Sequence, residues 1–169
     1  MLSRRFIRVK VFKLLFSSVH SQTFDLVSAE RELLKSLDKT RQLYFLLLSL
    51  PGALVRYARE RIDIGMQKYH PTADEINPNL RFVNNKAIEI LEKDRELEKA
   101  TGRGLNWASH RSYVKKVYDN LKDEPYFLEF MESPTEPSFA EDLKFLMDFF
   151  GSEPDEDPDL YSLLEDQNL

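Results

Sequence analysis

The chain has 169 residues and no cysteine. A disulfide framework, a thiol nucleophile and a thiolate metal site are therefore excluded. Glycine is scarce, with five residues, and Gly102 and Gly104 are better explained by a helix stop and a turn than by a phosphate-binding loop. His20, His70 and His110 are far apart, and none is paired with another ligand type at helical spacing. We expect a non-enzymatic protein without a cofactor or a metal ion.

Long apolar runs are also missing. The most apolar segment, residues 43–55, is interrupted by Pro51, and a membrane-spanning helix needs about 20 residues. At the N-terminus, Lys10 and Lys13 break the apolar run that a secretory signal requires. An Arg-rich, acid-poor mitochondrial presequence matches better and stays open as the alternative. We expect a cytoplasmic protein that does not contact a membrane.

Acidic residues are absent from the beginning of the chain, where the first carboxylate belongs to Asp25. The same stretch carries five basic side chains, namely Arg4, Arg5, Arg8, Lys10 and Lys13. The chain as a whole has a net charge of -5, and residues 153–169 contain acidic side chains but no basic one. A basic start on an acidic chain indicates an end that binds an anion.

The basic stretch has the pattern of a helix running from about residue 3 to residue 19. At about 100° per residue, Arg4, Arg5 and Arg8 form one ridge over its first two turns. Arginine binds phosphate in a bidentate manner, although a solvated helix start is the simpler alternative. From Phe6 onward the helix is apolar over most of its circumference, which is typical of an enclosed helix. The residues expected in the core are Ile7, Val11, Leu14 and Leu15.

Helical periodicity continues along most of the chain and predicts an all-α helical bundle, more than half helical and without a sheet. A second helix is expected after Ser21 or Thr23. A third is expected from Asp38 or Thr40 to about Lys68, kinked near Pro51, because its apolar stripe stays in phase across the proline. Further helices are expected after Asn84 or Asn85, near Asn106 or Ser109, from Pro125 to Met131, and from Ser138 to Gly151. We expect a helical domain over residues 1–151. Residues 152–169 are expected to be an acidic tail or connector, or the start of a further helical segment.

Two other groups of side chains are candidates for nucleic-acid contact. A second, looser basic patch consists of Arg111, Lys115 and Lys116. Trp107, Tyr113 and Tyr118 are aromatic residues that could stack on bases. Their helical spacing favours a place in the core instead.

The first helix resembles that of the NusB transcription antitermination family, which has two arginines, two residues, a third arginine and an apolar run closing on Gln, a spacer, Leu and Tyr. Arg4-Arg5-Phe6-Ile7-Arg8 and Lys13-Leu14-Leu15-Phe16 match this form in the three arginines and Leu15, and Phe16 occupies the aromatic position. Ile7 and Val11 stand where alanines are usual, and Lys13 replaces Gln. The rest, including residues 77–82 and 163–167, resembles a longer variant in which a helical extension follows the first helix. The resemblance implies that the chain ends before much of the ordinary domain.

The resemblance implies an RNA-binding protein that acts in transcription antitermination. Its ligand would be a single-stranded, boxA-like leader RNA, bound together with the small-subunit ribosomal protein NusE in a complex that keeps RNA polymerase elongating. Arg4, Arg5 and Arg8 carry over by the motif, with Lys10 and Lys13 as electrostatic neighbours. Phosphate contacts would supply most of the affinity. The alternative is a helical protein-interaction module that docks its basic N-terminal helix on an acidic partner.

Overall fold

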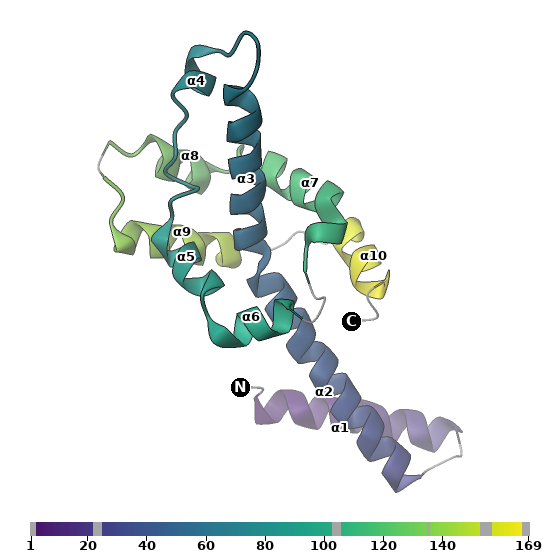
Figure 1. Ribbon diagram of the computed structural model, residues 1–169. Coiled ribbons are helices and arrows are strands. Elements are labelled where there is room, and N and C mark those ends of the chain that lie inside the picture. Colours follow the sequence, from purple (N-terminus) through teal and green to yellow (C-terminus); the bar gives the residue numbers. More distant parts are fainter. Residues whose placement is uncertain (1–2, 22–24, 103–105, 135, 153–156, 167–169) are drawn as a thin grey trace. The chain divides into compact units, whose positions relative to one another are not determined.

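The computed structural model describes residues 3–21, 25–102, 106–134, 136–152 and 157–166. These residues are 78 % helical and contain no strand, which confirms the expected all-α helical bundle. The helices (Figure 1) are α1 (Arg4–Ser21), α2 (Leu26–Leu48), α3 (Leu50–Met66), α4 (Ala73–Ile76), α5 (Lys86–Glu92), α6 (Arg95–Thr101), the 3-10 turn η1 (Ala108–His110), α7 (Arg111–Leu121), α8 (Pro125–Glu132), α9 (Phe139–Gly151) and α10 (Pro158–Asp166). Thr23, Gly104 and two parts of the predicted tail, 153–156 and 167–169, lie outside the described residues.

The chain divides into two compact units, residues 1–44 and residues 45–168. The first unit contains α1 and most of α2, and the second contains the last turn of α2 and all later helices. The boundary therefore falls inside α2, within the range that the sequence predicts to be one domain. Among the described residues of the first unit, none is buried.

The core of the second unit is built around α3, which packs against α7 and α5 (Figure 1). The first half of α3 is apolar on almost every side and is buried from Leu50 to Ala58, apart from Arg56. A second cluster joins the segment before α5 to α8 and α9 through stacked and edge-on phenylalanine rings. Its members are Phe82, Phe127, Phe130 and Phe145. Each buried phenylalanine contributes about 1.5–3 kcal/mol through the hydrophobic effect.

The predicted kinked helix is found as α2 and α3, separated by the single residue Ser49. Ser49 keeps a right-handed helical backbone, with φ −82° and ψ −8°. Its N–H donates to Phe45 O at 3.0 Å, and its carbonyl accepts from Ala53 N at 3.2 Å, so helical hydrogen bonds continue across the interruption. Pro51 lacks the N–H that would donate to Leu47 O, which explains why the break occurs here.

Two expectations about this part of the chain are wrong. No boundary occurs at Asp38 or Thr40, because α2 runs through both residues. The helix also begins later than Ser21 or Thr23. It is capped by Asp25, whose carboxylate accepts a hydrogen bond from Ser28 N at 3.0 Å.

The expected burial of the first helix is wrong as well. Ile7, Val11 and Leu14 are only half-buried, and Leu15 is 45 % exposed. The physical reason is that α1 belongs to a two-helix unit, and one neighbouring helix can cover only one side of another. An apolar pattern around the whole circumference therefore leaves apolar side chains exposed within this unit.

Candidate nucleic-acid interface

The three arginines of the predicted ridge are exposed on the first two turns of α1. Among the described residues, no ion pair involves Arg4, Arg5 or Arg8, and α1 contains no acidic residue. Cations at the start of a helix lie at the positive end of its dipole, an arrangement that lowers helix stability slightly. The same arrangement attracts an anion, because both the arginines and the positive end of the helix dipole favour negative charge there. The ridge is thus an exposed basic surface with the charge that an anion requires.

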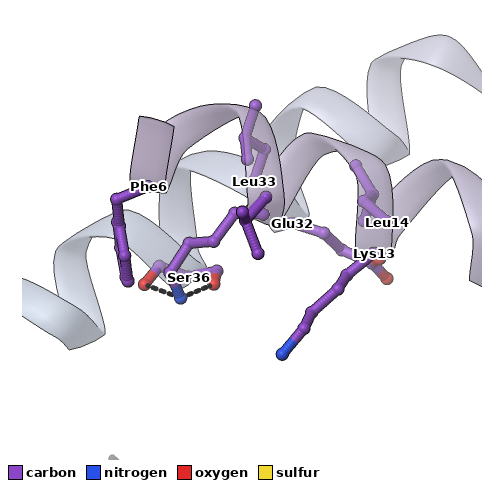
Figure 2. A pocket seen from close by; sticks show the side chains of 8 residues that line it. Phe6, Lys13, Leu14, Glu32, Leu33 and Ser36 are labelled. Atoms are coloured by element: carbon purple, nitrogen blue, oxygen red, sulfur yellow. Dashed lines mark hydrogen bonds between the residues drawn. The ribbon is translucent and has the colours of Figure 1, made fainter. Parts of the chain in front are cut away.

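The two lysines of the predicted site differ in their surroundings, and Figure 2 labels Lys13 and also Ser36, which accepts the hydrogen bonds of Lys10. Lys10 donates through Nζ to Ser36 O at 3.2 Å and to Ser36 Oγ, and it lies over the Phe6 ring at 5.3 Å. It therefore ties α1 to α2 and is committed to the structure of the first unit. Lys13 is exposed and lines a shallow pocket of about 360 Å³ beside Glu32. Lys13 is the lysine that remains open to a ligand.

The second basic patch has mostly internal partners. Arg111 forms an ion pair with Glu60, with 2.6 Å between Nη2 and Oε2. Lys116 Nζ lies 2.6 Å from Asp159 Oδ2 and 2.9 Å from Asp157 Oδ1, and these two carboxylates raise the pKa of Lys116. Lys115 is exposed, and within the described ranges it forms no ion pair. Judged by the described residues alone, the patch therefore offers a phosphate one free cation, not three, and Arg111 and Lys116 hold α7 to neighbouring segments.

The aromatic side chains of the same region belong to the core. Trp107 is 2 % exposed and stacks on buried Tyr113, with 5.6 Å between the ring centroids. Burial, followed by the charge and hydrogen bond of Asp157, raises the pKa of Tyr113 to about 12. Tyr118 is half-buried and meets Tyr57 edge-on at 5.4 Å. The predicted core location is confirmed for Trp107 and Tyr113, so these two rings are not a base-stacking platform, whereas Tyr118 is only half-buried.

Aromatic side chains that the sequence argument placed inside an enclosed helix are instead exposed on α1. Phe12 is 67 % exposed and Phe16 is 57 % exposed, and their ring centroids are 6.2 Å apart. The ring of exposed His20 follows 4.6 Å beyond Phe16. The signal in the sequence is a four-residue repeat that continues from Arg4 and Arg8 into these rings. The repeat is hard to recognise from the sequence, because α1 also has apolar residues on its other side. The whole helix therefore has the apolar pattern of a core helix.

Comparison of the chain with protein-family models, curated proteins and solved structures finds no match. Across the described ranges, His, Asp and Glu side chains form no group of three or more that could hold a metal ion. In the same part of the chain, no helix combines enough length with enough apolar character to cross a bilayer.

Proposed function

We propose that the chain is an RNA-binding transcription antitermination factor that resembles NusB. In this proposal it binds a single-stranded, boxA-like leader RNA with the ribosomal protein NusE, and it acts indirectly on the RNA polymerase elongation complex. The observation that carries the RNA part is the exposed ridge of Arg4, Arg5 and Arg8 on a helix without an acidic residue. The part about NusE and antitermination comes from the resemblance of the first helix to that family.

The mechanism follows from the chemistry of the ridge. Each guanidinium can donate two parallel hydrogen bonds to a phosphate, and Arg4 and Arg8 lie one helical turn apart, about 6 Å along the axis. A flexible single strand can place successive phosphates along such a ridge. Most of the binding free energy then comes from the release of counterions condensed on the RNA. Lys13 adds charge beside the ridge, and Lys10 contributes only to the field because its amine is bonded to Ser36.

Replacing Arg4, Arg5 and Arg8 together with alanine is expected to weaken RNA binding at least tenfold, which is about 1.4 kcal/mol. The loss of three phosphate contacts should also flatten the slope of log K against log salt by about 2. Fluorescence anisotropy with a labelled single-stranded RNA, repeated at several salt concentrations, measures both quantities. Circular dichroism should not change, because the three side chains are exposed and form no ion pair with another described residue.

A matched control removes the same charge elsewhere. Lys86, Arg95 and Lys99 are exposed on α5 and α6, outside the proposed site. Their triple alanine variant should keep at least half of the RNA affinity and most of the salt slope. Equal losses in both triple variants would show that only net charge matters, and the ridge would then not be a site.

Docking on an acidic protein is the alternative use of the same ridge, and it would also weaken with salt. Competition separates the two. If the ridge binds RNA, unlabelled RNA should displace the labelled strand at a lower concentration of negative charge than heparin does. Different RNA sequences should also compete unequally. Competition that depends only on the charge of the polyanion would favour an acidic partner over RNA.

A further inference from the structure

One exposed row of side chains runs along the whole of α1. Residues four apart are neighbours on a helix surface, turned by about 40° from one another, and here every fourth residue is a cation or an aromatic ring. The row consists of Arg4, Arg8, Phe12, Phe16 and His20. All five are exposed. At about 40° per step the row winds around the helix by about 160° from Arg4 to His20, so its cationic end passes gradually into its aromatic end along the exposed half of α1.

The aromatic half of this row has the geometry of a stacking surface. The Phe12 and Phe16 rings are 24° from parallel at 6.2 Å, and the Phe16 and His20 centroids are 4.6 Å apart. Burying a phenylalanine side chain stabilises a protein by about 1.5–3 kcal/mol. Two neighbouring rings left in water forgo this stabilisation, which is unfavourable unless a ligand covers them. A contiguous exposed aromatic patch indicates a binding surface.

We propose that this row is a continuous binding track for single-stranded RNA, in which bases stack on Phe12 and Phe16 while Arg4 and Arg8 hold phosphates. The inference rests on the proposed RNA-binding function and adds residues that the arginine motif does not include. Bases have flat apolar faces, and stacking on exposed aromatic side chains tolerates any sequence. His20 extends the track by one further ring.

The charges on the same face favour RNA over the other possible occupants. Arg5 and Lys13 flank the row, and α1 contains no acidic residue. A second copy packed through the same face of α1 would bring the same positive charges against it. An apolar protein segment would leave the arginines without anionic partners, which is unfavourable. RNA supplies anions and flat rings together. The aliphatic side chains of Leu15 and Val19, also exposed, can contact the edges of stacked bases.

The test compares the 169-residue chain with its Phe12→Leu/Phe16→Leu variant, which keeps apolar side chains but removes both rings. The probe is a labelled single-stranded RNA of about 12 nucleotides, a length within the usual site size for stacking proteins. One stacked base is worth about 1–3 kcal/mol, or roughly 5- to 150-fold, so we expect the variant to bind at least tenfold more weakly. The slope of log K against log salt should stay unchanged, because the phosphate contacts remain.

Two further measurements isolate the bases. An oligomer of equal length whose sugars carry no bases should bind the variant and the unchanged chain equally. Phe12→Trp/Phe16→Trp should keep the affinity, and its added indole emission should be quenched when RNA is bound. The matched control is Phe139→Leu/Phe150→Leu, which changes two exposed rings on α9 and should bind RNA as the unchanged chain does.

The outcomes are distinguishable. If the Phe12 and Phe16 variant binds RNA normally while the Arg4, Arg5 and Arg8 variant does not, the stacking track is wrong and the RNA function stands. If the unchanged chain binds neither oligomer at moderate salt, the proposed function itself fails. If sedimentation shows a dimer that Phe12→Leu/Phe16→Leu dissociates, with unchanged RNA affinity, the face belongs to a second copy and the track is overturned.

Discussion

Replacing Phe145 with alanine is expected to lower the free energy of unfolding by about 3–5 kcal/mol. Phe145 is 3 % exposed on α9, and its ring centroid lies 4.7 Å from that of Phe130 and 5.7 Å from that of Phe82. Removing the ring opens a cavity where α8, α9 and the segment before α5 meet, and these elements cannot all move in to fill it. Since natural domains have a total stability of about 5–15 kcal/mol, the loss would be a large part of the whole.

Urea unfolding followed by tryptophan fluorescence measures this loss, because Trp107 is the sole tryptophan and is buried in the same unit. The control is Phe139→Ala. Phe139 lies on the same helix but is 49 % exposed, and surface substitutions usually change stability by less than about 0.5 kcal/mol. Equal losses for Phe145→Ala and Phe139→Ala would contradict a core centred on Phe145.

Features set by neighbouring residues could be predicted from the sequence. The capping box before α9 is one of them, since Ser138 N donates to Glu141 Oε2 at 2.9 Å and Glu141 N donates to Ser138 Oγ at 3.3 Å. The N-cap of α5 is another, with Ile88 N donating to Asn85 Oδ1 at 3.0 Å. Capping requires only residues within one turn, so these signals do not depend on the tertiary fold.

Features that depend on distant residues could not be predicted. Asp142 belongs to α9, and its Oδ2 accepts a hydrogen bond at 2.9 Å from the N–H of Lys86, the first residue of α5, although the two residues are far apart in the sequence. Residues 152–169 were expected as a tail or as a further helix, and they contain α10, which begins next to the two carboxylates that bind Lys116. Nothing in the local pattern of α7 indicates these partners.

The candidate site shows the same division. Periodicity correctly places Arg4, Arg5 and Arg8 on one side of a helix, because their relative angles are fixed by the helix itself. Periodicity also shows that the remaining sides are apolar, but it cannot show whether another element covers them. Lys10 looked like a member of the basic cluster by composition, and only the position of Ser36 on α2 shows that its amine is engaged.

Replacing Trp107 with alanine is the second change expected to cost about 3–5 kcal/mol. The indole is buried against Tyr113, and its Nε1–H donates to Leu46 O at 2.9 Å and to Ser49 Oγ at 3.1 Å. These acceptors lie at the junction between α2 and α3, just before Pro51, where the helical hydrogen-bond pattern lacks one donor. Trp107 therefore supplies packing and a hydrogen bond at the weakest point of this helical pair.

Trp107→Phe separates the two contributions, because it keeps an aromatic ring in the core and removes only the N–H donor. Loss of one buried hydrogen bond costs about 1–3 kcal/mol, so the phenylalanine variant should lie between the unchanged chain and the alanine variant. Urea unfolding followed by circular dichroism measures all three, since neither variant keeps a tryptophan. If alanine costs less than about 1 kcal/mol, below the usual range for a buried tryptophan, the junction does not depend on Trp107. If Trp107→Phe lowers the free energy of unfolding as much as Trp107→Ala does, the hydrogen bonds to Leu46 and Ser49 contribute more than the packing of the ring. The junction near Pro51 then depends on the indole N–H donor.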